Sequence, residues 1–184
     1  MGIMDLFNRD AAIPRIDLVW LNRAAKLKGA ADYLAKNKTD LCVAWFEETQ
    51  LIFNRCFEEN HINIPIRMAD SLGLYDLNNK IAVFLEHYPL YSREAHVLSK
   101  NMPAGICFMN SLDDTFFRLF GGKIEKLMRT MGVGEDENIE SPMISATVIR
   151  AQKKLEKKVR DDFHARSGEE WMERYRTYWQ HHLR

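Results

Sequence analysis

Four short apolar runs, separated by stretches with helical spacing, constrain this chain more than any other feature of its sequence. The runs cover residues 40–46, 62–68, 80–86 and 104–110. Short apolar runs that alternate with helices are typical of an α/β fold with a mainly parallel sheet. We therefore predict an α/β domain whose sheet contains these four strands, and Pro65 directs the second of them to an edge.

Helix signals fill the stretches between these runs. Leucine and alanine recur at helical spacing from residue 18 to residue 36, so we predict a helix there. Acidic residues open the segment 47–61, and the partial positive charge of a helix N-terminus favours such residues. A long helix is predicted from Pro142, because proline in the first turn lacks only an N–H that the helix does not use.

Composition and charge exclude several function classes. The chain has 184 residues, its 26 basic residues equal its 26 acidic residues, and its formal net charge is zero. Such a chain has no general attraction for nucleic acid or anionic lipid, so we expect no nucleic-acid partner. No apolar stretch approaches the ~20 residues that a spanning helix needs, so we expect no membrane insertion. The N-terminus lacks the apolar core of a signal peptide, which favours a cytoplasmic location.

Cysteine and histidine usage predicts neither disulfides nor a metal site. The three cysteines, Cys42, Cys56 and Cys107, form no C-x-x-C pair, and two of them lie in apolar runs. We expect buried, reduced thiols, as in a reducing cytoplasm. His181 and His182 lack a third ligand at a suitable spacing, so we predict no metal ion and no other cofactor.

One long motif runs through residues 110–159. It begins with S-L-D-D before an F-G-G segment, continues through E-D-E-N-I-E-S-P-M-I-S, and ends with A-Q-K-K in a basic helix. This segment resembles SecA, the preprotein translocase ATPase, where its second RecA-like motor domain passes into its scaffold helix. The matching residues include Ser111, Leu112, Asp114, Phe120, Gly121, Glu135, Asp136, Ile139, Glu140, Ser141, Met143, Ser145, Ala151, Gln152 and Lys153.

The resemblance implies a fold and a domain organisation. A weaker likeness in the same order extends over residues 18–160, so the implied fold is a RecA-like, mainly parallel sheet flanked by helices, with a helical C-terminal extension. Three parts are implied: an N-terminal arm at 1–17, a degenerate motor domain at 18–139, and a helical extension at 140–184 resembling the start of the SecA scaffold. We expect this extension to project from the domain, and the chain to come from a bacterium.

The chain departs from SecA at the residues that make that family an ATPase. SecA binds ATP with a G-x-x-x-x-G-K-[ST] phosphate loop, and no such sequence occurs here. The family's arginine motif falls at residues 97–105, where Lys100 is the one cation, and a lysine cannot make the bidentate contacts of a guanidinium group. We therefore expect no enzymatic activity. An ATPase completed by a separate chain with a phosphate loop is the least favoured alternative.

Polar residues cluster after the third predicted strand. Ligand sites of parallel sheets lie at the carboxyl ends of the strands. The candidates for a remnant nucleotide-binding cleft are Glu86, His87, Arg93 and Lys100. The alternative is an ordinary loop whose tyrosines pack against the domain and whose charged groups are solvated.

Four aromatic residues form a stripe near the C-terminus: Trp171, Tyr175, Tyr178 and Trp179. Their helical spacing places them on one face, which either packs back on the domain or docks a protein partner or a second copy. Trp171 fits the core better, and Trp179 is the best candidate for an outside contact. We predict a non-catalytic SecA-like domain that acts as a protein-binding or assembly module linked to protein translocation. The alternative is a sensor that binds a nucleotide or another small ligand in the remnant cleft.

Overall fold

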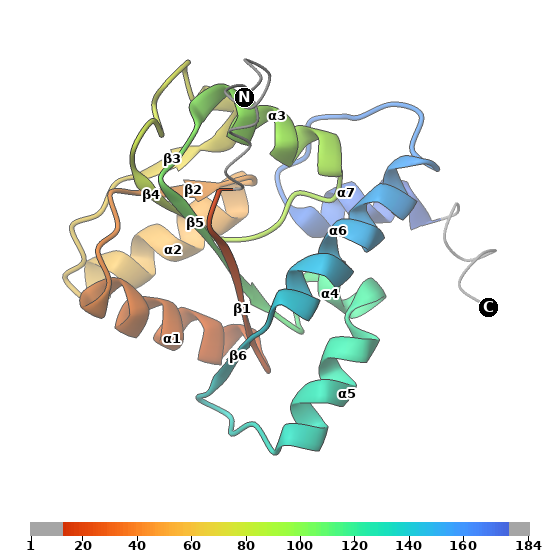
Figure 1. Ribbon diagram of the computed structural model, residues 1–184, viewed down its shortest axis with the longest axis horizontal. Helices are drawn as coiled ribbons and strands as arrows, with labels where there is room; N and C mark the ends of the chain where they lie inside the picture. Colours follow the sequence, from red (N-terminus) through yellow and green to blue (C-terminus); the bar gives the residue numbers. More distant parts are fainter. Residues whose placement is uncertain (1–12, 177–184) are drawn as a thin grey trace, which may run out of the picture.

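The protein has an α/β fold built on one six-stranded sheet. The computed structural model describes residues 13–176. The strand order is β3-β2-β4-β5-β1-β6, and all neighbours are parallel except β1 and β6 (Figure 1). The strands are β1 (Arg15–Trp20), β2 (Leu41–Ala44), β3 (Ile66–Met68), β4 (Ile81–Phe84), β5 (Gly105–Ser111) and β6 (Asn138–Glu140). The predicted fold class, a mainly parallel sheet flanked by helices as in RecA-like domains, is confirmed.

Seven α-helices and one 3-10 turn accompany these strands within the described residues, and the last two helices follow β6. The helices are α1 (Arg23–Lys36), α2 (Glu47–Glu59), α3 (Tyr91–Asn101), α4 (Thr115–Phe120), α5 (Gly122–Met131), α6 (Pro142–Glu156) and α7 (Gly168–Arg174), and the turn is η2 (Ala69–Ser71). Ser141 caps α6 through its hydroxyl, which accepts from Met143 N, and Pro142 occupies the first turn as expected. No described helix has both the length and the apolar character needed to cross a bilayer.

The four predicted strands are present, and Pro65 precedes β3 at the edge of the sheet, as predicted. The prediction of a helix starting at residue 18 is wrong. Residues Arg15–Trp20 instead form β1, between β5 and β6, and this strand begins inside the expected N-terminal arm. The helix starts later because the side chain of Asn22 accepts a hydrogen bond from Ala25 N and caps α1.

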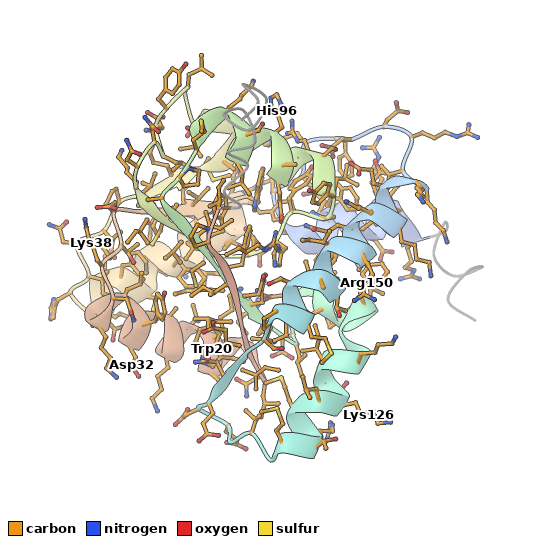
Figure 2. All side chains as sticks on the ribbon, in the orientation of Figure 1. Trp20, Asp32, Lys38, His96, Lys126 and Arg150 are labelled. Atoms are coloured by element: carbon orange, nitrogen blue, oxygen red, sulfur yellow. The ribbon has the colours of Figure 1, made fainter. Side chains whose placement is uncertain are left out.

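Two hydrophobic clusters cover the two faces of the sheet. The alternation of β1 divides its side chains: Leu18 and Trp20 pack with α1 and α2, and Val19 packs on the opposite face. Trp20 lies against α1 at Gly29 and is fully buried (Figure 2). All three cysteines are buried and unpaired, and burial raises the pKa of the Cys107 thiol to about 12. The prediction of buried thiols is confirmed.

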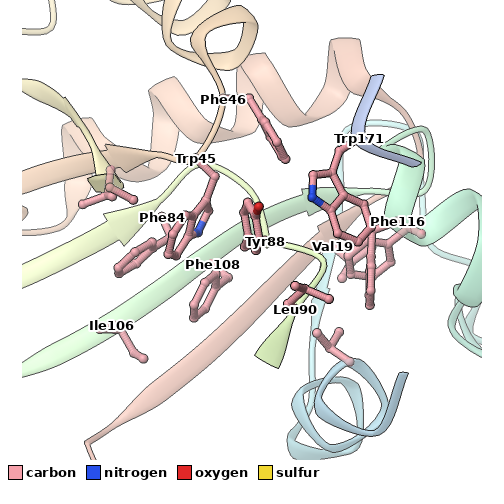
Figure 3. Close-up of a cluster of buried hydrophobic side chains, with 14 of the residues drawn as sticks. Val19, Trp45, Phe46, Phe84, Tyr88, Leu90, Ile106, Phe108, Phe116 and Trp171 are labelled. Carbon is pink, nitrogen blue, oxygen red and sulfur yellow. The ribbon is translucent and has the colours of Figure 1, made fainter. Parts of the chain in front are cut away.

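The C-terminal helices pack on the second face. Ile144, Val148 and Leu155 of α6 are buried, and α6 contacts β1 and α3. Trp171 of α7 is fully buried among the aromatic residues of this cluster (Figure 3). The expectation that the extension projects is therefore wrong for its described part, because the apolar stripe of α6 is covered by the sheet. The expected single long helix also ends earlier, at Glu156, before a loop leads to α7.

Candidate functional site

The carboxyl ends of β4 and β5 open into a cavity of about 60 Å³. The first turns of α1, α2, α4 and α7 contribute to its wall, so the cavity lies where the carboxyl edge of the sheet meets several helix N-termini. Its polar lining includes Lys26, Thr49, Glu86, Asn110 and Asp114. This is the position at which parallel sheets hold ligands.

Glu86 follows β4 and ties it to the start of α2. Its Oε1 accepts hydrogen bonds from the backbone N–H groups of Trp45 and Phe46, both at 3.1 Å. Its Oε2 accepts from the hydroxyl of Thr49 at 2.6 Å. The carboxylate thus caps α2 in place of Phe46, the N-cap residue, whose side chain makes no capping bond. Burial raises the pKa of Glu86 to about 7, although nearby Lys26 opposes the shift.

Lys26 and Asp114, which both line the cavity, form an ion pair. Lys26 Nζ lies 2.8 Å from Asp114 Oδ2, and Lys26 is only 3% exposed. Asp114 also accepts from the backbone N–H of Ser111 at 2.8 Å and from its hydroxyl at 3.0 Å. The pair joins α1 to the turn before α4, and it neutralises a cation that would otherwise be available to a phosphate group.

Asn110 lies at the end of β5 and is fully buried. Its Nδ2 donates to the carbonyl oxygen of Leu18 at 3.3 Å. Among the residues that the structure describes, its Oδ1 has no hydrogen-bond partner. A buried amide oxygen without a partner is unusual, because each such group loses its hydration without compensation.

A second polar cluster is centred on His87, which also lines the cavity. The imidazole is buried between Asp17 on β1, with Nε2 2.6 Å from Oδ1, and Glu94 on α3, with Nδ1 2.8 Å from Oε1. Arg15 Nε donates to Asp17 Oδ2 at 3.0 Å, and Ser145 on α6 also donates to Asp17. Two carboxylates therefore face two cationic groups, and the cluster links β1, α3 and α6.

The electrostatics of this second cluster favour a charged imidazole. Burial lowers the pKa of His87, but Glu94 and Asp17 outweigh burial and raise it above its ordinary value. Burial would raise the pKa of Asp17, but His87 and Arg15 hold it well below its ordinary range. The imidazolium also stacks on Phe108, with ring centroids 4.1 Å apart. Each buried charge in this network has an oppositely charged partner, so the network can hold β1 and α3 together.

The four candidate residues for a remnant cleft do not all lie together in the structure. Glu86 and His87 both line the cavity. Arg93 points to a different hollow, where it pairs with Asp70 at 3.0 Å and Asp162 at 3.1 Å. Lys100 is exposed near the end of α3 and does not line the cavity. The sequence interpretation overlooked Lys26 and Asn110, because the first sits in an unremarkable helical pattern and the second ends an apolar strand.

The aromatic stripe is partly inside the protein. Trp171 is fully buried, and its Nε1 donates to Asp162 Oδ1 at 2.9 Å. Tyr175 is also buried, and its hydroxyl donates to the carbonyl oxygen of Asp161. Both side chains are covered by this chain and present no free surface to a partner. Tyr178 and Trp179 lie outside the described residues.

An open groove of about 740 Å³ lies elsewhere, between α4, α5 and the loop after β1. Its apolar lining includes Leu21, Leu112 and Val133, and its rim carries Arg118 and Arg129. Most of these residues belong to the segment 110–159. The groove is therefore a second feature, formed by the part of the chain whose motif resembles SecA.

Comparison with known proteins identifies one related region. No protein-family model matches the chain. The protein translocase subunit SecA of Symbiobacterium thermophilum is 46% identical over 50 residues, and that of Christiangramia forsetii is 49% identical over 55 residues. The SecA subunit of Sulfurovum sp. is 48% identical over 50 residues. These matches cover 27–29% of this chain and 5–6% of the relatives. The chain contains a SecA-related region and spans a small fraction of the length of these relatives.

Proposed function

We propose that this chain is a non-catalytic relative of the SecA motor, acting as a protein-binding or assembly module in protein translocation. The observation that carries the proposal is the SecA-related region, which the relatives share at 46–49% identity over 50–55 residues. The segment 110–159, which resembles SecA, comprises the end of β5, the helices α4 and α5, the strand β6 and the helix α6. These residues support the fold and are not residues that bind or transfer phosphate.

The charges around the carboxyl edge support a non-catalytic role. Phosphoryl transfer needs cations that face the transferring group. Lys26 is instead paired with Asp114, and Arg93 is paired with Asp70 and Asp162. The whole sequence also lacks a phosphate loop. A degenerate, vestigial motor domain accounts for both observations.

The groove beside α5 supports a protein-binding role. It combines half-buried apolar walls with two arginines, and arginine is enriched in protein interfaces. Arg118 pairs with Glu169 and Arg129 with Glu125, and both arginines remain solvent-exposed. Either a translocation partner or a second copy of this chain is an acceptable occupant of a module of this kind. We expect Arg129 and Val133 to contribute to binding, since both line the groove.

The proposal is tested by capture from the native cell. The full chain, tagged at one end, should retain translocase subunits that mass spectrometry identifies, and Val133→Asp and Arg129→Glu should reduce their recovery. Arg55→Glu on the exposed side of α2 is the matched control and should retain them. Equal recovery of translocase subunits by the chain and by an unrelated bait would contradict the proposal.

A sensor function is the second candidate. The cavity beside Glu86 is the observation that favours it, because it lies at the ligand-binding edge of a parallel sheet. In this alternative, occupation of the cavity alters the chain's interactions without any chemical step.

A further inference from the structure

The orientation of the Asn110 amide is determined by its backbone partner. Its Nδ2 donates to the Leu18 carbonyl at 3.3 Å. The flipped amide would place two acceptors against each other, so the oxygen is the atom that remains without a partner. Asn110 lines the cavity and is fully buried. An occupant of the cavity that donates a hydrogen bond would satisfy this oxygen.

Lys26, in contrast, has N–H donors that lack an acceptor within the described part of the chain. An ammonium group has three N–H donors. Among the described residues, Lys26 Nζ donates one hydrogen bond, to Asp114, and lies 5.8 Å from the centre of the Phe53 ring. The side chain is only 3% exposed, so bulk water does not readily reach the remaining donors. An occupant that accepts a hydrogen bond would satisfy them.

These two requirements exclude a simple ion. The cavity wall carries both signs of charge: an anion would meet the Asn110 oxygen and the carboxylates of Glu86 and Asp114, and an ammonium ion would meet Lys26, Arg23 and His87. A neutral group with a donor next to an acceptor meets both needs. We propose that this cavity binds a small molecule through an amide group, whose oxygen accepts from Lys26 and whose N–H donates to Asn110. The inference rests on the cavity and is independent of the protein-binding role.

The remaining walls fit such a ligand. A cavity needs a volume of ~10–15 Å³ to hold one water molecule. The volume of this cavity is about 60 Å³, which is enough for an amide with a few attached atoms. A second N–H of a primary amide has an acceptor in Glu86, whose Oε2 receives one hydrogen bond from Thr49. Ile52, Phe53 and Met172 provide apolar contact for the rest of the molecule.

The donor and acceptor pattern of an amide occurs on free carboxamides and on nucleobase edges. Acetamide and uracil are therefore the two probes, and acetate and methylammonium are the charged controls. Nuclear magnetic resonance of the full chain should show saturable shifts of the Asn110 side-chain N–H signals in the millimolar range for an amide probe. The probe that binds more tightly shows whether the cavity prefers a free carboxamide or a nucleobase edge.

Two variants of the cavity test the proposal. Asn110→Leu and Lys26→Met should each weaken amide binding at least tenfold, and Asn78→Asp on an exposed turn should not. Should a variant fail to fold, the Asn110 signals of the unmodified chain still decide the question. Absence of a saturable shift would mean that the cavity holds water only and would overturn the proposal. Equal binding of acetate or methylammonium, or unchanged binding by folded variants, would also overturn it.

Discussion

Nε2 of His87 lies 2.6 Å from Oδ1 of Asp17, although the two residues are 70 positions apart in the chain. The contact joins the turn after β4 to the strand β1, and Glu94 completes it from α3 at 2.8 Å. Both carboxylates accept hydrogen bonds from the charged imidazole, so protonated His87 is the form that stabilises the fold.

The stability of the protein should therefore fall as the pH rises through the folded-state pKa of His87. This pKa is raised above 6.5, so the contribution is fully present below pH 6.5 and is lost above the raised value. His87→Gln should remove this alkaline fall and cost ~3–5 kcal/mol near pH 6, because it leaves buried carboxylates without their partner. Urea unfolding at several pH values measures both effects. His96→Gln, on the exposed side of α3, should match the unmodified protein (Figure 2); an identical loss there would refute the assignment.

Glu86 should produce a separate pH effect in a more acidic window. Its pKa is raised from 4.5 to about 7, so the folded state binds more protons than the unfolded state between these values. Stability should fall as the pH rises from 4.5 to 7. Glu86→Gln, which can still accept the two N–H groups at the start of α2, should flatten this part of the profile. A profile with the same slope in the variant would show that Glu86 is not the responsible group.

Gly29 should not tolerate a side chain. A Cβ atom at this position would overlap the indole of Trp20, whose Cζ2 atom would lie 2.7 Å away. Because Trp20 is fully buried, Gly29→Ala should lower the free energy of unfolding by ~1–3 kcal/mol. Gly122→Ala is the matched control, since a Cβ added there would meet no atom within 4 Å outside its own helical turn. Thermal unfolding compares the two; equal melting temperatures would contradict the predicted overlap.

Trp171 should be a core residue rather than an interface residue. It is fully buried, and it donates to Asp162, which also accepts from Tyr88 at 2.6 Å. Trp171→Ala should cost ~3–5 kcal/mol, which lowers the melting temperature by about 6–20 °C at this chain length. Met143→Ala, at an exposed position of α6, should have little effect. Loss of partner binding without loss of stability in Trp171→Ala would instead indicate an interface.

The isolated chain should release no phosphate from ATP. The expectation follows from the absent phosphate loop and from the carboxylates that neutralise Lys26 and Arg93. A coupled phosphate assay on repurified protein measures it, with heat-denatured protein as the control. Sustained release that survives repurification would overturn the non-catalytic proposal.

Local patterns in the sequence were sufficient for the fold class. Apolar runs that alternate with helical spacing predicted four of the strands and the parallel sheet, and Pro65 placed β3 at the edge. The start of α1 was missed because periodicity alone does not separate a short apolar strand from a buried helical turn. The cap at Asn22 was the local signal that distinguishes them.

The candidate site was decided by tertiary structure. Lys26 and Asp114 are 88 positions apart, and nothing in their local sequence predicts that they meet. The free oxygen of Asn110 depends on its neighbour Leu18 across the sheet, 92 positions away. Strand order determines which carboxyl ends lie together, and only that order brings these groups into one cavity. The α/β layers therefore follow from the local periods of the apolar residues along the chain. The cavity and the His87 network arise from pairings across the sheet, which those local periods do not encode.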